Sequence, residues 1–180
     1  MPFRMRDLRP ARARARVRAR GFTLIELMVT LAVLVVLIAI AVPSFDSIRL
    51  STRLSSYATA LVAGSQLARS EAIKRNAPIT LCASSDGTSC STNGQWEAGW
   101  IVLSGTQVLR AESAAASGYR LREAGGASAV VFQATGLGAG QSRITICRAT
   151  PSTDQSRAVS ISATGRTTVT RSSSGTCPAT

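Results

Sequence analysis

One carboxylate stands inside a strongly apolar stretch of this 180-residue chain. Glu26 is the only charged residue between positions 22 and 42, which read FTLIELMVTLAVLVVLIAIAV. A carboxylate inside an apolar membrane span costs about 2.5–3.5 kcal/mol on insertion scales, and such a residue usually serves a function and needs a partner. Because no lysine or arginine lies one helical turn to either side of Glu26, the partner must come from outside this segment.

The cysteines are the next candidates for chemistry, because the chain contains no histidine. Catalytic groups and metal sites that depend on histidine are therefore excluded. None of the four cysteines forms a C-x2-C pair, which disfavours zinc and leaves disulfides in three possible connectivities. We favour one bond that closes a short loop and one that ties the C-terminal tail to the last strands, in an oxidising compartment. These bonds would be Cys82–Cys90 and Cys147–Cys177, and we expect no enzyme, no metal and no cofactor.

The arginines form the third group of interest, because a net charge of +12 suggests a nucleic-acid partner. Eight of them precede Gly21 and, with one aspartate, give this short tail a charge of +7. Residues 22–142 carry only +1, and residues 143–180 carry +4. The question of a nucleic-acid ligand therefore concerns five C-terminal arginines, which are Arg143, Arg148, Arg157, Arg166 and Arg171.

The apolar run around Glu26 is long enough to cross a membrane. Its 21 residues would span about 31 Å as a helix, close to the thickness of the hydrocarbon core of a bilayer. A signal peptide has a shorter apolar core of about 7–15 residues and a small-residue cleavage site, which Pro43-Ser44-Phe45 does not provide. We therefore expect a transmembrane helix over residues 22–43. The positive tail, residues 1–21, marks the cytoplasmic side, so the rest of the chain lies across the membrane.

The helical pattern continues beyond Pro43, with small and apolar residues at steps of three and four. Asn76-Ala77-Pro78 stops it. We predict one helix from about Phe22 to about Asn76, whose second half, residues 44–76, presents an alanine-rich stripe to a sheet. The stripe comprises Leu54, Ala58, Leu61, Ser65, Ala68 and Ala72.

From Ile79 onward the period of the apolar residues changes to two, and glycine-rich turns separate many of the segments. Residues 77–180 are therefore predicted to form a β-rich domain. A long helix packed on an antiparallel sheet gives an α+β fold. The predicted strands are Ile79–Cys82, Gly99–Leu103, Gln107–Ala111, Tyr119–Glu123, Ala129–Gln133, Ser142–Arg148, Arg157–Ser162 and Arg166–Arg171.

The segment GFTLIEL at positions 21–27 resembles the prepilin processing signature of type IV pilins and type II secretion pseudopilins. The resemblance implies that a prepilin peptidase cuts after Gly21 in the cytoplasm, removes the leader and methylates the new amine of Phe22. Glu26 would then pair with the amino terminus of a neighbouring subunit, since an ammonium group from another chain neutralises a carboxylate in lipid. Pro43 stands where the helix of this family often bends, as expected of a proline inside a helix.

Two further segments, ITLCASSDG at positions 79–87 and GWIVL at positions 99–103, resemble the GspH/FimT group of minor pilins and pseudopilins. The resemblance implies a pilin-like fold and a subunit near the tip of a type IV pilus or a type II secretion pseudopilus, which supports filament initiation or protein secretion. Its partners would be other pilins, the prepilin peptidase and the inner-membrane assembly platform. Before assembly it would cross the bacterial inner membrane once, with its C-terminal domain in the periplasm.

The same region allows two ligand-binding interpretations. Trp96 and Trp100 could stack on a ligand, but burial in the core is favoured because the outer domain has few other aromatic residues. Asp86-Gly87 could begin a calcium loop, but no further acids follow at EF-hand spacing, so a plain turn is favoured.

Some FimT-like minor pilins bind DNA during natural transformation through C-terminal arginines that include a G-R-x-R sequence. Here Gly165-Arg166 matches, but Thr168 stands in place of the second arginine. On a regular strand Arg166 and Arg171 also point to opposite faces, whereas nonspecific DNA binding needs several phosphate contacts on one surface. DNA contact and a solvated basic face therefore remain alternative interpretations of the five arginines.

Overall fold

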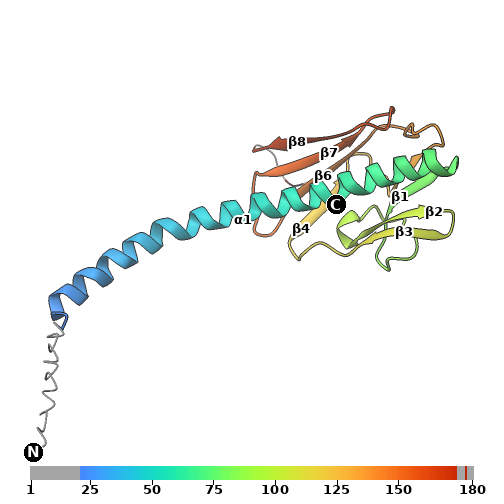
Figure 1. Cartoon of the computed structure of the whole chain (residues 1–180). Helices are drawn as coiled ribbons and strands as arrows, with labels where there is room; N and C mark the ends of the chain where they lie inside the picture. Colours follow the sequence, from blue (N-terminus) through green and yellow to red (C-terminus); the bar gives the residue numbers. More distant parts are fainter. Residues whose placement is uncertain (1–20, 174–176, 178–180) are drawn as a thin grey trace, which may run out of the picture. The chain divides into compact units, whose positions relative to one another are not determined.

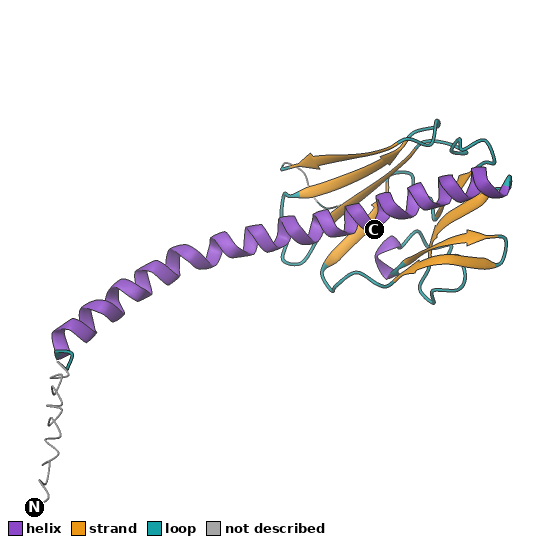
Figure 2. Cartoon of the chain, viewed as in Figure 1, coloured by secondary structure: helices purple, strands orange, loops and turns teal. Residues whose placement is uncertain are grey.

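The computed structural model describes residues 21–173 and residue 177, with the backbone alone at positions 41–44. In this part of the chain one long helix, α1 (Leu24–Arg75), is followed by eight strands and one short 3-10 helix, η1 (Trp96–Ala98) (Figures 1 and 2). The chain divides into two compact units between Pro43 and Ser44, although the helix assignment continues through both positions.

The first unit contributes the apolar half of α1. Every described side chain from Phe22 to Ile40 is exposed. One 18-residue window has a mean hydropathy of 2.9 and no buried residue, so the segment is long and apolar enough to cross a membrane. A helix that is apolar on all sides and covered by nothing in its own chain requires an outside environment, either lipid or other helices.

The second unit, from Ser44 onward, contains the other half of α1 and both sheets. This half of α1 buries one stripe at three- and four-residue steps, as the sequence predicts. The stripe packs in a single core with residues of both sheets, and it also includes Leu50, one turn before its predicted start. Its buried members are Leu50, Leu54, Ala58, Leu61, Ser65, Ala68 and Ala72.

The eight predicted strands are present to within about two residues, but they form two antiparallel sheets instead of one. The first sheet has the order β3-β2-β1-β5, and the second has the order β4-β6-β7-β8. The strands of the first are β1 (Ile79–Ala83), β2 (Trp100–Ser104), β3 (Gln107–Glu112) and β5 (Ala129–Phe132). Those of the second are β4 (Tyr119–Glu123), β6 (Ser142–Arg148), β7 (Ser156–Ile161) and β8 (Thr167–Ser172).

The two tryptophans belong to the core, which confirms the favoured interpretation. Trp96 is fully buried, and its Nε1–H donates to the carbonyl of Ala127 at 2.9 Å. Trp100 packs so closely on the helix that a Cβ added to Gly64 would lie 2.5 Å from its ring. Glycine at this position therefore sets the distance between α1 and the first sheet.

Asp86 closes a hydrogen-bonded turn after β1. Its carboxylate accepts from the backbone N–H groups of Thr88 and Ser89 and from the hydroxyls of Ser84 and Ser89. These donors, the Ser89 hydroxyl first among them, hold the pKa of Asp86 far below its usual range. Among the described residues no group of three or more acids or cysteines is arranged to hold a metal.

Candidate functional site

The start of α1 is organised by a cap that the sequence contained and that we did not predict. The Thr23 hydroxyl accepts a hydrogen bond from the backbone N–H of Glu26 at 3.3 Å. Thr23 therefore acts as the N-cap, and Glu26 occupies the third helical position. The spacing T-x-x-E is the signature of a capping box, which could have located this helix start in advance.

Glu26 is exposed on the first turn of the apolar helix, four residues after Phe22. A carboxylate is favourable at this end of a helix because the free backbone N–H groups carry partial positive charge. Within the described part of the chain Glu26 takes part in no ion pair, and Phe22 is 78% exposed. The segment thus presents an acid and an aromatic residue on a surface that the rest of the described chain leaves uncovered.

Both favoured disulfides are present. Cys82 is bonded to Cys90, which ties the end of β1 to the Asp86 turn. Cys147 on β6 is bonded to Cys177, which ties residue 177 to the second sheet. Among the described residues no cysteine is free.

The structure separates the five C-terminal arginines into two groups at different places on the second sheet. Arg148 donates two hydrogen bonds, of 3.0 and 3.3 Å, to the carboxylate of Asp46 on α1. Arg157 is only 5% exposed and donates to the hydroxyl of Ser51 at 2.9 Å. Arg171 lies opposite Arg157 in the strand register. These three arginines belong to the end of the sheet that meets the start of the second half of α1.

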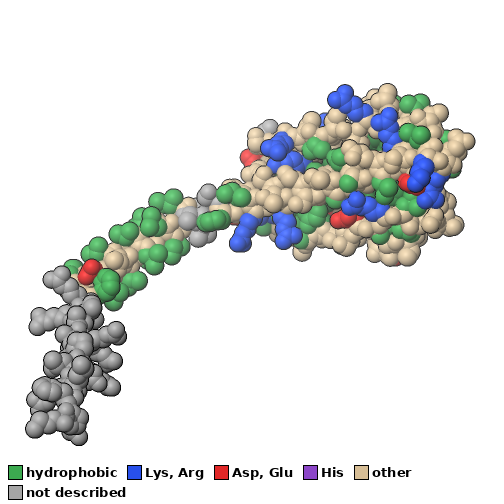
Figure 3. Space-filling view, viewed as in Figure 1, with side chains coloured by type: hydrophobic (Ala, Val, Ile, Leu, Met, Phe, Trp, Pro, Cys, Tyr) green, Lys and Arg blue, Asp and Glu red, His purple; other side chains and the backbone are tan. Residues whose placement is uncertain are grey.

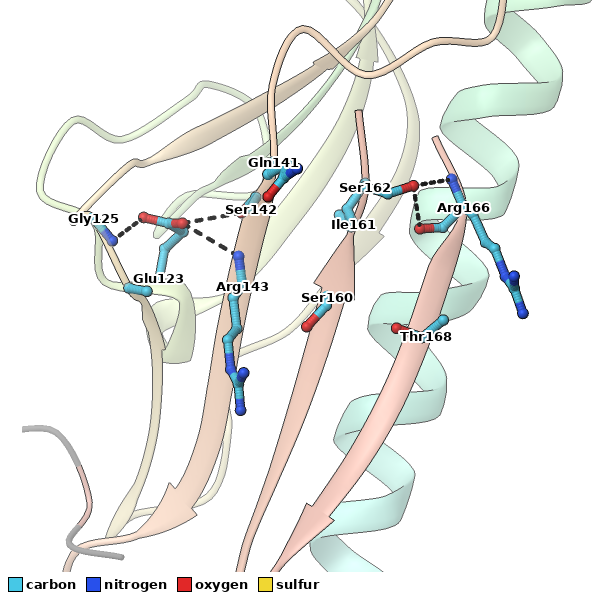
Figure 4. Close-up of a pocket in the computed structure, with 11 residues that line it drawn as sticks. Glu123, Gly125, Gln141, Ser142, Arg143, Ser160, Ile161, Ser162, Arg166 and Thr168 are labelled. Carbon is cyan, nitrogen blue, oxygen red and sulfur yellow. Dashed lines mark hydrogen bonds between the residues drawn. The ribbon is translucent and has the colours of Figure 1, made fainter. Parts of the chain in front are cut away.

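Arg143 and Arg166 are brought together elsewhere, in an open depression of about 840 Å³ on the second sheet (Figure 4). Arg143 comes from β6 and Arg166 from the residue before β8, with β7 between them. Both are exposed. Ser160 and Thr168 lie in register with Arg143 and form the floor of the depression.

An acid shares this depression. Partial burial acts to raise the pKa of Glu123, but backbone N–H groups of Ala127, Gly125 and Arg143 and the hydroxyl of Ser142 together lower it. Glu123 therefore carries a negative charge at neutral pH, and it offsets part of the charge of the two arginines. An anion bound here would meet two guanidinium groups and one carboxylate.

The half-motif Gly165-Arg166 has an explanation in the fold. Gly165 adopts a positive φ of 73°, and a Cβ at this position would collide with the carbonyl oxygen of Gly136. The next residue is held by Ser162, whose hydroxyl accepts from the backbone N–H of Arg166 at 3.1 Å. Glycine is thus required by the turn before β8, whatever Arg166 binds.

Comparison with known families identifies the chain. The profile described as Type II transport protein GspH matches residues 57–165, which is more than half of the sequence. The chain belongs to the GspH family. The profile of the prokaryotic N-terminal methylation motif matches residues 16–42 of this GspH-family protein. It covers Gly21, Phe22 and Glu26, whereas the GspH match ends before Arg166 and Arg171.

Solved structures agree with this assignment. The type IV minor pilin FimU of Pseudomonas aeruginosa aligns with a TM-score of 0.55 and 26% identity, over 67% of this chain and 90% of FimU. A second crystal form of FimU aligns with a TM-score of 0.53 and 27% identity, over 65% of this chain and 92% of FimU. The minor pseudopilin EpsH of the Vibrio cholerae type 2 secretion system aligns with a TM-score of 0.49 and 14% identity, over 66% of this chain and 96% of EpsH. No curated protein sequence gives a significant match. The likeness to FimU shows that the GspH-family protein has the pilin-like fold predicted from its sequence.

Proposed function

We propose that this GspH-family protein is a minor subunit that enters a type IV pilus or a type II secretion pseudopilus through the apolar half of α1. The observation that carries the proposal is the exposure of the whole segment from Phe22 to Ile40 around a lone acid. Helices of neighbouring subunits would cover the apolar surface. The amino terminus of one of them would supply the cation that Glu26 lacks.

Entry into the filament would follow processing in the inner membrane. We propose that the prepilin peptidase cuts after Gly21 on the cytoplasmic side and methylates Phe22. The domain from Ser44 onward would lie in the periplasm, where an oxidising environment permits its two disulfides. The inner-membrane assembly platform would then take up the mature chain.

The 26% identity to FimU, a type IV minor pilin, supports a pilus as the filament, although the matching family profile is that of a type II transport protein. We further propose a position near the tip, where the subunit would help to initiate the filament. Immunogold labelling of sheared filaments would test the position, since label at filament ends supports it and label along the shaft contradicts it.

The assembly proposal is tested by Glu26→Ala and Glu26→Gln in the full chain. We expect both variants to lose the leader normally and to be missing from sheared filaments, because neither offers a carboxylate to the neighbouring amine. Leu34→Ala is a matched control, since Leu34 is also exposed in the apolar segment but carries no charge. Mass spectrometry of the mature chain and immunoblots of the filament fraction are the measurements. Normal assembly of Glu26→Ala would show that charge pairing is not required.

A second candidate function is DNA capture on the filament surface. The observation that favours it is that Arg143 and Arg166 line one depression. The charge of Glu123 and the absence of the second arginine of the G-R-x-R sequence weigh against it. Assembly through α1 therefore remains the first proposal, and the two functions are compatible in one subunit.

DNA binding is tested by gel shift with duplex DNA at two salt concentrations. The unit Ser44–Thr180 is suitable because it has its own core and both disulfides. Arg143→Gln with Arg166→Gln should weaken binding and reduce the slope of log affinity against log salt by about 2. Arg49→Gln with Arg53→Gln removes the same charge from α1 and should leave binding unchanged. No shift at low salt, or an equal effect of the two pairs, would exclude the depression as a DNA site.

A further inference from the structure

Four arginines surround the first two turns of α1 in the second unit, with Arg157 and Arg171 on the side of Ser51 and with Arg49 and Arg53 on the opposite side of the helix. Arg157 bonds to Ser51, and Arg171 lies beside Arg157 on the edge strand β8. Arg49 and Arg53 are exposed on α1 itself, four residues apart and thus on one face of the helix. Figure 3 shows basic side chains on α1 at this end of the domain. We call Arg49, Arg53, Arg157 and Arg171 the basal arginines.

Arg157 is the unusual member of this group. It is 5% exposed, and among the described residues its hydrogen bonds go to a serine hydroxyl and a backbone carbonyl. Within the same part of the chain its Nε finds no partner and no carboxylate forms an ion pair with it. The carboxylate of Asp46 is already held by Arg148. A buried guanidinium without a counter-ion is costly, so an anion beyond those of the described residues would be favourable at this end of the sheet.

Apolar side chains stand beside the basal arginines. Phe45 and Ile48 are 60% and 58% exposed, on the same stretch of α1 as Arg49. A combination of exposed aromatic or aliphatic residues and basic residues is typical of segments that lie at the interface between lipid and water.

The chain itself keeps this region near the membrane surface. Val42 ends the apolar run, and at about 1.5 Å per helical residue Arg49 lies roughly 10 Å beyond it. Ser51 and Arg53 follow within one further turn. Because these residues follow the apolar run directly in the chain, they stay within this short distance of its end at any angle between the two units.

From these observations we infer that the basal arginines, together with Phe45 and Ile48, bind the headgroups of anionic phospholipids in the periplasmic leaflet before the subunit enters a filament. A lipid phosphate at the edge of β8 would contact Arg171 and approach the exposed side of Arg157. The inference rests on the proposed membrane anchoring, because it needs the apolar segment to lie in a bilayer.

A carboxylate of a neighbouring subunit could also supply an anion, but connectivity favours lipid. The membrane surface lies within a short distance of the basal arginines in every unassembled subunit, whereas a neighbour is present only in the filament. Interfacial residues such as Phe45 also suit a lipid boundary better than an ion pair between proteins. The site would hold the domain down on the membrane and release it when extraction begins.

The test uses the full chain in nanodiscs of phosphatidylcholine with a minority of phosphatidylglycerol, analysed by native mass spectrometry. We expect the wild-type chain to retain phosphatidylglycerol at least about fivefold above its bulk proportion, since each basic residue near an anionic surface contributes roughly that factor. A triple variant with Arg49→Gln, Arg53→Gln and Arg171→Gln should retain phosphatidylglycerol only in its bulk proportion. These three arginines are exposed, so the variant should fold, and Arg157 stays in place.

Arg143→Gln with Arg166→Gln is the matched control, because it removes exposed positive charge at the other end of the second sheet. The inference would be overturned if the wild-type chain retained phosphatidylglycerol only in its bulk proportion. It would also be overturned if this control lost as much phosphatidylglycerol as the triple variant. Loss of enrichment in millimolar inorganic phosphate would also overturn it, since the site would then bind free anions and not a lipid surface. A wild-type chain that inserts but shows no enrichment contradicts only this inference. A chain that fails to insert contradicts the proposed function.

Discussion

The two halves of α1 form one helix but depend on different surroundings. The half from Ser44 to Arg75 buries a stripe of residues against both sheets, and Leu54 and Leu61 are fully inaccessible to solvent. The half before Pro43 buries none of its described side chains. The first arrangement is complete within one chain, whereas the second requires a bilayer or a filament.

The difference is visible in the residue pattern. The second half has one buried side of apolar and small residues, and its other sides are largely polar and exposed. Gly64, Ser65 and Ala68 on or beside the buried side are small and allow the sheets to approach closely. The first half is apolar on every side apart from Thr23, Glu26 and Thr30. A helix with apolar residues on one side packs that side against a particular surface of its own chain. A helix with apolar residues on all sides requires only an apolar environment.

The largest expected effect is that of Gly21→Ala, which should block processing and leave the fold intact. A Cβ at this position would meet nothing within 4 Å, so the chain itself gives no steric reason for glycine. We expect the variant to keep its leader and to be missing from filaments. Its thermal unfolding midpoint should equal that of the wild type.

The measurements for Gly21→Ala are the mass of the N-terminal peptide and the unfolding of the full chain in detergent. A shift in the midpoint would mean that Gly21 serves the fold, and normal cleavage would mean that the peptidase tolerates a side chain here. The first result would contradict the expectation that Gly21 has no role in the fold, and the second would contradict the expectation that processing requires glycine at this position.

The comparison between the halves is sharpened by Leu54→Ala and Leu34→Ala. Truncation of the buried Leu54 should destabilise the domain by about 2–5 kcal/mol, because it leaves a cavity against the sheets. The same change at the exposed Leu34 should leave the stability of the domain unchanged. Denaturant unfolding of both full-length variants in detergent, followed by tryptophan fluorescence, measures the difference. Equal losses would show that the first half of α1 also packs within its own chain.

Most of the fold could be predicted because its signals are local. The alternation of apolar residues and the glycine-rich turns located all eight strands, and the short spacing of Cys82 and Cys90 indicated their bond. The division into two sheets was not predicted. β4 lies between β3 and β5 in sequence but pairs with β6, and such a pairing depends on distant segments that alternation does not identify.

The positions of the C-terminal arginines also depend on pairing between distant strands, which the sequence pattern does not reveal. Arg157 was expected on an exposed basic face, either solvated or in contact with DNA, and its burial overturns both interpretations for this residue. Ala158 and Val159 beside it are buried as well, so alternation does not reveal which side of β7 is covered. Arg143 and Arg166 line the same depression because β7 pairs with both β6 and β8. The cap at Thr23, by contrast, was readable from T-x-x-E and was missed.

A smaller effect is expected from Gly64→Ala. Alanine normally stabilises a helix relative to glycine, but here the new Cβ would lie 2.5 Å from the Trp100 ring. Overpacking should therefore cost about 1–3 kcal/mol in the free energy of unfolding. Gly140→Ala is the control, because its Cβ would meet nothing within 4 Å. Combining Gly64→Ala with Trp100→Phe should cost less than the sum of the single changes. A stabilised Gly64→Ala would show that the helix can move away from the first sheet at no cost.

The smallest expected effect lies where the two halves of α1 meet. The hydrogen bonds from Arg148, followed by its charge, lower the pKa of Asp46 below its ordinary value of 3.8. Because the folded-state pKa is depressed, the ion pair stabilises the domain above pH 3.8, and this contribution is lost as the pH falls through the lower folded-state value. The Asp46 side chain is 63% exposed, although that of Arg148 is only 13% exposed, so solvent and salt screen the pair and the effect should be small.

Asp46→Asn should therefore lower the thermal midpoint slightly at neutral pH, and its difference from the wild type should shrink as the pH drops below 3.8. Asp154→Asn is the control, because it removes the same charge from an aspartate that forms no ion pair among the described residues. Hydrogen exchange of the first turn after Ser44 reports the same change locally, because the ion pair fixes that turn to β6. A difference that persists unchanged into strong acid would mean that the Asp46→Asn substitution disturbs the helix itself, and that the second half of α1 is held at this end by packing alone.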